Sequence, residues 1–196
     1  MFMFRTFVWV VVLNLFVGCS SVKYGDATDV ETVNTDFGST DLQIIANKMV
    51  DDMLVFPPLL AITAKARPVI FIDGIQNNTT EHIDMQSITD SIQTKLIQSG
   101  YYRFVDPKAL ARVKAQFNYQ QNSGLIDPAT AVKVGKQIGA EYMLYGNMAS
   151  ITKQGNSQRD VYYKFTLKMM NLKTGILEWS GEEEIRKTRS RAWFGS

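Results

Sequence analysis

The sequence predicts a single α/β domain. Its mixed sheet of about four to five strands has an antiparallel C-terminal meander and is flanked by about four helices. Between residues 39 and 140, apolar residues recur at helical spacing around two short apolar runs, which is typical of crossover helices that join strands. After residue 140 the apolar spacing changes to strict alternation, which is typical of paired strands. The chain contains no internal repeat, so 196 residues leave room for one domain.

The first helix is expected to begin near residue 40 and to end before Pro57 and Pro58. Thr40 and Gln43 have the spacing of a capping box, and a proline pair cannot continue a helix. The residues expected on its buried face are Leu42, Ile45, Met49 and Met53.

Two short strands and one helix follow. Val69–Ile72 is apolar at every position, as expected for a central strand that is covered on both faces. A helix from about residue 83 to residue 99 should end at Gly100, and residues 101–105 form the next short strand. The predicted buried stripe of this helix is Met85, Ile88, Ile92 and Leu96.

Two further helices are expected to begin at Asp106-Pro107 and Asp127-Pro128, since each pair places an acceptor at the N-cap and proline at the first helical position. Their apolar faces are Leu110, Val113 and Phe117, and Ala131, Val134 and Ile138.

The last part of the chain predicts three antiparallel strands. The first covers residues 141–151, the second residues 160–170, and the third runs from Ile176 to about residue 185. Residues 152–159 are expected to form a polar hairpin loop. In the second strand, one face carries Val161, Tyr163, Phe165, Leu167 and Met169, and the other carries Tyr162, Lys164, Thr166 and Lys168.

The N-terminus has the layout of a bacterial lipoprotein signal. Arg5 precedes an apolar run that is too short to cross a bilayer, and Cys19 follows it directly. We therefore expect residues 1–18 to be a cleaved signal peptide, 19–38 a lipidated flexible tether, and 39–196 the globular domain. The alternative is an ordinary buried thiol at Cys19 after an uncleaved leader. Ser20, in place of the aspartate that keeps lipoproteins on the inner membrane, favours an outer-membrane anchor that faces the periplasm.

The composition argues against several classes of function. Without Arg5 the chain carries 20 basic and 19 acidic side chains, so a basic field for nucleic acid is absent. The lone histidine, His82, cannot supply a catalytic triad or a histidine-rich zinc site, and Gly135-Lys136 lacks the glycines of a phosphate loop. We expect no enzyme, no metal, no small-molecule substrate and no cofactor other than the covalent lipid on Cys19. The acidic run 182–184 is interpreted as solvated surface.

Two polar segments have more than one interpretation. Asn77–Thr80 is expected to form a strand-to-helix turn in which side chains bond the backbone. The basic run Arg186–Arg191 is either a frayed C-terminus or a contact for anionic lipid or glycan strands.

Four segments carry a family resemblance: Phe37–Gln43, Arg67–Ile70 with Asn77 and Thr79, Gly135–Gly146, and Thr174–Trp179. Together they resemble the LpoB family of outer-membrane lipoproteins, from about residue 37 to residue 187. That family has a fold similar to the N-terminal domain of TolB, and its members activate a bifunctional penicillin-binding protein. The resemblance implies a non-enzymatic regulator of peptidoglycan synthesis.

Two other classes stay open. The same type of module occurs in curli-secretion lipoproteins, so the chain could be an assembly protein of another envelope complex. An unrecognised envelope enzyme would need a nucleophile and base that the sequence does not display. For a regulator, we expect partner contacts at Tyr162, Lys164, Asn77 and Arg159. The alternative is that helices cover both sheet faces and Tyr162 is packed in the interior.

Overall fold

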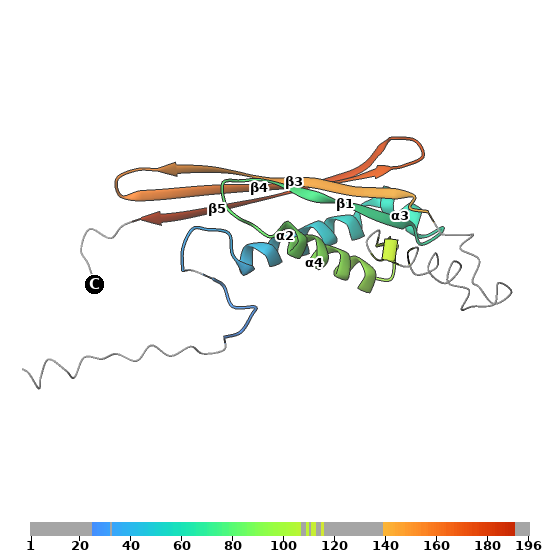
Figure 1. Ribbon diagram of the computed structural model, residues 1–196, viewed down its shortest axis with the longest axis horizontal. Coiled ribbons are helices and arrows are strands. Elements are labelled where there is room, and N and C mark those ends of the chain that lie inside the picture. Colours follow the sequence, from blue (N-terminus) through green and yellow to red (C-terminus); the bar gives the residue numbers. More distant parts are fainter. Residues whose placement is uncertain are drawn as a thin grey trace, which may run out of the picture.

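The computed structural model describes residues 25–31, 33–106, 109, 111, 112, 115 and 139–190 (Figure 1). One five-stranded sheet lies over a helical layer, with strand order β2-β1-β3-β4-β5. The described elements are α2 (Ser39–Val55), α3 (Pro57–Thr63), β1 (Val69–Asn78), α4 (Met85–Gln98), β2 (Arg103–Val105), β3 (Tyr142–Gln154), β4 (Gln158–Asn171) and β5 (Leu177–Ser190). This architecture confirms the predicted α/β fold, with three helices in the described part.

The start of α2 differs from the prediction. Its N-cap is Gly38, and the Asp41 carboxylate accepts a 2.8 Å hydrogen bond from the Gly38 backbone N–H. The predicted capping box at Thr40 and Gln43 is therefore wrong, because both residues already lie within the helix. The proline pair ends α2 as expected, but it also begins the short helix α3, where the missing proline N–H groups are tolerated.

The parallel half of the sheet follows the predicted order. β1 pairs in parallel with β2 on one side and with β3 on the other, so it is a central strand. Helix α4 begins at Asp84, whose carboxylate accepts from the first-turn N–H groups, and Gly100 follows the helix with φ of 79°. The predicted stripe of α4 is buried as expected.

The antiparallel half extends further than predicted. β3 and β4 stay paired as far as Gln154 and Arg159, so the expected loop 152–159 is wrong except for its central residues. β5 stays paired with β4 to Ser190, so residues 186–190 are strand and not a frayed end. Figure 1 shows this hairpin and the end of β5 reaching past the helices on the left.

The core lies between the sheet and the helices. The inward face predicted for β4 is fully buried, and it packs in one cluster with the predicted faces of α2 and α4, of which only Leu42 stays partly exposed. The helices predicted after Asp106 and Asp127 lie almost wholly outside the described residues. At the first, Asp106 accepts a 2.9 Å hydrogen bond from the Ala109 backbone N–H, as expected for an N-cap.

Candidate partner-binding face

The sheet has one face against the helices and one face that no described helix covers (Figure 1). We call the second one the open face. Along each strand, residues of the open face alternate with buried residues, because successive side chains of a strand point to opposite sides. The registers place on it Met143, Tyr145, Asn147, Ala149 and Ile151 of β3, Tyr162, Lys164, Thr166 and Lys168 of β4, and Ser180, Glu182, Glu184 and Arg186 of β5.

Tyr162 and Lys164 lie together on the open face within a ladder of charged side chains. The Arg186 guanidinium lies over the Tyr162 ring, 5.8 Å from its centroid. Lys164 Nζ lies 2.8 Å from Glu182 Oε2 and 3.9 Å from Glu184 Oε1. Hydrogen bonding to Glu184 raises the pKa of Tyr162, and hydrogen bonding to Glu182 raises the pKa of Lys164. At neutral pH this patch therefore presents a neutral phenol and a charged ammonium.

The other two predicted contacts lie elsewhere. Asn77 is still part of β1, so the turn begins later than expected. Its side chain nevertheless bonds the turn as expected, because it donates to the Glu81 carbonyl and accepts from the backbone and hydroxyl of Thr79. Arg159 belongs to the opposite set of β4 residues and pairs with Asp36 at 2.9 Å. The structure thus brings Tyr162 and Lys164 together and separates Asn77 and Arg159 from them.

Below the sheet, residues 35–38 are held by a cluster of polar side chains. The Tyr163 hydroxyl lies 2.6 Å from Glu81 Oε1 and 3.2 Å from the Thr35 carbonyl oxygen. Glu81 Oε2 also accepts from the Phe37 backbone N–H at 2.9 Å. Burial, and then the bond to Glu81, raise the pKa of Tyr163, which favours its neutral form.

A buried ion pair completes this cluster. Lys187 Nζ lies 2.9 Å from Asp41 Oδ2 and 2.7 Å from the Asp36 carbonyl oxygen. The Asp41 side chain is 5% exposed and that of Lys187 is 18% exposed. The pair connects the start of α2 to β5, so the chain that enters the domain is fastened to its last strand.

Several groups that define this surface were missed from the sequence. The ladder of Lys164 with Glu182 and Glu184 depends on the β4–β5 register, which spacing along one strand does not reveal.

His82 is exposed, as expected for a residue in a polar turn. In the described ranges, histidine, cysteine and carboxylate side chains form no group able to hold a metal ion. The helices described here include none that is long and apolar enough to cross a membrane.

Comparison with known proteins identifies the family. The family model described as "Peptidoglycan-synthase activator LpoB" matches residues 41–185. The penicillin-binding protein activator LpoB of Edwardsiella piscicida is 24% identical over 75% of this chain and 68% of that protein. LpoB of Erwinia amylovora is 26% identical over 67% of this chain and 63% of that protein. The chain thus spans about two thirds of the length of these relatives.

Solved structures include a similar domain. The LpoB C-terminal domain from Escherichia coli aligns with a TM-score of 0.44 and 23% identity, over 70% of this chain and 92% of that one. The family match itself spans α2, α4 and most of the sheet, including the Tyr162 and Lys164 positions. On that match, the chain belongs to the LpoB family of peptidoglycan-synthase activators.

Proposed function

We propose that this chain is a regulator anchored by its lipid to the outer membrane, and that it binds and activates a bifunctional penicillin-binding protein from the periplasmic side. The observation that carries the proposal is the family match over residues 41–185, which includes both the helical layer and the open face. The relatives' shared description as penicillin-binding protein activators supports the choice of partner. In this proposal the chain changes the activity of the synthase by binding and supplies no catalytic group.

The open face around Tyr162 is the surface that we propose for the synthase. Tyrosine and arginine are enriched among the residues that dominate binding energy at protein interfaces, and here both stand on the strands of the sheet. The partly exposed Tyr162 ring and the Arg186 guanidinium offer an apolar and a charged contact side by side. The proposal leaves Asn77 and Arg159 as contacts only if the partner reaches around the sheet.

Tyr162→Ala should weaken binding of the synthase by about 2 kcal/mol, which is roughly a 30-fold rise in Kd. The ring makes no contribution to the core, so the melting temperature should change little. Titration calorimetry with the purified synthase measures the first quantity, and thermal unfolding the second. Tyr101→Ala is the matched control, because Tyr101 is an exposed tyrosine outside the open face. A large loss of melting temperature with unchanged affinity would show that Tyr162 acts in folding and not in binding.

Cys19→Ser should release the protein from membranes without unfolding it. In the proposed anchor, the acyl chains on Cys19 supply the membrane affinity, at about 0.8 kcal/mol per buried methylene. Fractionation after a salt wash, with the domain's thermal unfolding as the control, tests this. A variant that stays in the membrane fraction would place the anchor elsewhere.

Affinity purification of the mature lipoprotein from its own envelope tests the choice of partner. Retention of a bifunctional penicillin-binding protein, together with stimulated glycan polymerisation by that synthase in solution, is the expected result. Retention of a secretion or assembly complex without any synthase would instead favour the assembly class.

A further inference from the structure

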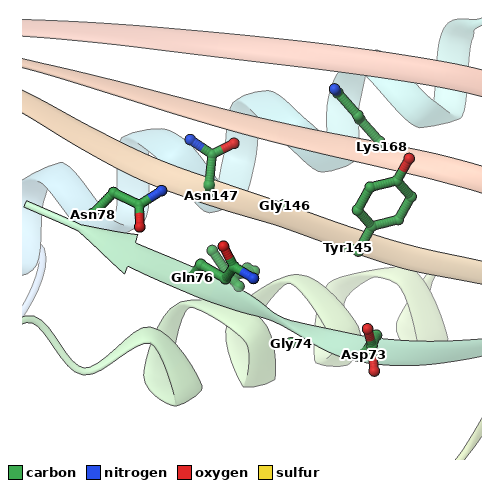
Figure 2. Close-up of a pocket in the computed structure, with 9 residues that line it drawn as sticks. Asp73, Gly74, Gln76, Asn78, Tyr145, Gly146, Asn147 and Lys168 are labelled. Atoms are coloured by element: carbon green, nitrogen blue, oxygen red, sulfur yellow. The ribbon is translucent and has the colours of Figure 1, made fainter.

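A polar cavity of about 550 Å³ lies on the open face, and Tyr162 is not among the residues that line it. Figure 2 shows the residues that do. Its walls come from three adjacent strands, β1, β3 and β4. Its polar side chains are Asp73, Gln76, Asn78, Tyr145, Asn147 and Lys168. The volume falls within the roughly 300–1,000 Å³ typical of small-molecule sites.

A β-bulge shapes one wall of this cavity. Ile72 pairs with Leu144 and Gly74 with Tyr145, so Asp73 is an extra residue in β1. Gly74 has φ of 107°, a conformation that other residues rarely adopt, and a Cβ added there would meet open space. The bulge therefore leaves the backbone bare beside the Tyr145 ring, and bulges of this kind are frequent next to binding sites.

Within the part of the chain that the structure describes, most polar side chains of the cavity have no bonding partner. Gln76 and Asn147 lie directly opposite one another in the β1–β3 register, and Tyr145 lies opposite Lys168 in the β3–β4 register. Among the described residues, the side chains of Gln76, Asn78, Asn147 and Lys168 make no hydrogen bond or ion pair with one another or with their neighbours. In contrast, Lys164 on the same strand is paired with two glutamates.

The chemistry of these groups matches an N-acetylated sugar. Each carboxamide offers both donors and an acceptor, which suits hydroxyl and acetamido groups that also do both. Tyr145 offers an aromatic ring on which the C–H face of a sugar can pack, and its hydroxyl adds a further donor and acceptor. Lys168 adds one positive charge for a carboxylate. Figure 2 shows the Tyr145, Asn147 and Lys168 side chains rising from the same side of the sheet.

We propose that this cavity binds the glycan strand of peptidoglycan. N-acetyl and hydroxyl groups bond Gln76, Asn78 and Asn147, one sugar ring packs on Tyr145, and the lactyl carboxylate of an N-acetylmuramic acid unit pairs with Lys168. The assignment of the glycan to peptidoglycan rests on the proposed function, whereas recognition of a carboxylated N-acetyl sugar rests on the cavity alone. The regulator would then contact its synthase at one end of the open face and the polymer at the other.

The test titrates the full-length lipoprotein in detergent with two sugars and follows binding by calorimetry. The disaccharide of N-acetylglucosamine and N-acetylmuramic acid carries the carboxylate, whereas chitotriose is N-acetylated but neutral. We expect Lys168→Met to weaken binding of the first sugar about 10-fold and to leave chitotriose unchanged. Tyr145→Ala should weaken both sugars by a similar factor, and Tyr145→Phe, which keeps the ring, should retain most of the binding.

Lys153→Met is the matched control, because Lys153 is an exposed lysine near the far end of β3. It should change neither affinity by more than about twofold. Absence of binding of both sugars to the wild-type protein would overturn the proposal, as would an equal effect of Lys153→Met and Lys168→Met. Synthase binding measured on the same samples separates the two proposals: sugar binding without synthase binding refutes only the proposed function, and the reverse refutes only the glycan site.

Discussion

Replacing Asp41 with alanine should lower the free energy of unfolding by about 3–5 kcal/mol, as is typical when one partner of a buried ion pair is removed. The variant leaves the Lys187 ammonium in a largely buried position, where its one remaining hydrogen-bond partner among the described residues is the Asp36 carbonyl oxygen. It also removes the acceptor for the Gly38 backbone N–H at the start of α2. Urea unfolding followed by circular dichroism measures the loss.

Asp51→Ala is the control for this variant, since Asp51 lies exposed on the same helix. It should change stability by less than about 0.5 kcal/mol. The double variant Asp41→Leu/Lys187→Met should recover much of the loss, because an apolar pair removes both desolvated charges. A loss below about 1 kcal/mol in Asp41→Ala would mean that Lys187 turns to solvent and that the pair does not fasten β5 to α2.

Deleting residues 20–25 should abolish activity in cells while leaving synthase binding in solution intact. The tether predicted from the sequence, residues 19–38, has about 20 residues and would span at most roughly 70 Å when fully extended. In the structure, however, residues before α2 already bond to it: Gln43 donates to the Ala27 carbonyl, and Glu31 accepts from the Ser39 backbone N–H. Seven residues lie between Cys19 and Ala27, so the chain spans at most about 28 Å from one to the other. The deletion leaves one residue between them and reduces this span to about 7 Å.

The control replaces residues 20–25 with six glycine and serine residues, which keep the length and change the sequence. We expect this variant to keep its activity in cells. Both variants retain the hydrogen bonds of Ala27 and Glu31 to α2, which a shortening within residues 22–34 would break. If the deletion variant remains active in cells, the length of chain between Cys19 and the domain does not limit activity. That result would favour an assembly protein of another envelope complex over an activator of the synthase.

Side-chain periodicity was enough to predict the buried faces of the domain. Ile88, Ile92 and Leu96 of α4, and Tyr163 and Phe165 of β4, are all buried as their spacing predicts. Burial follows the period of each element, and that period is local to the sequence. Strand ends were predicted less well, because residues 152–154 and 186–190 are polar but stay in the sheet through backbone pairing with their neighbours.

The two-residue period of a strand also explains why two of the predicted binding residues do not lie together. Tyr162 and Arg159 are three positions apart on β4, so the two-residue period of a strand puts them on opposite faces. The polar cavity could not be predicted, since it requires the β1 bulge and the register of three strands. Neither the bulge at Asp73 nor the pairing of Gln76 with Asn147 leaves a pattern within either strand alone.

By itself the sequence determined the buried faces of the predicted elements, the order of helices and strands in the described part apart from α3, and the resemblance to the family. Hydrophobic spacing sets the first two, because a helix or strand must turn its apolar side chains away from water. The tertiary structure alone decided which polar residues meet. Strand register joins Lys164 to Glu182, and the packing of α2 under β5 joins Asp41 to Lys187, although 146 positions separate them. Such contacts depend on how distant segments align, and a one-residue shift in register would exchange the two faces of a strand.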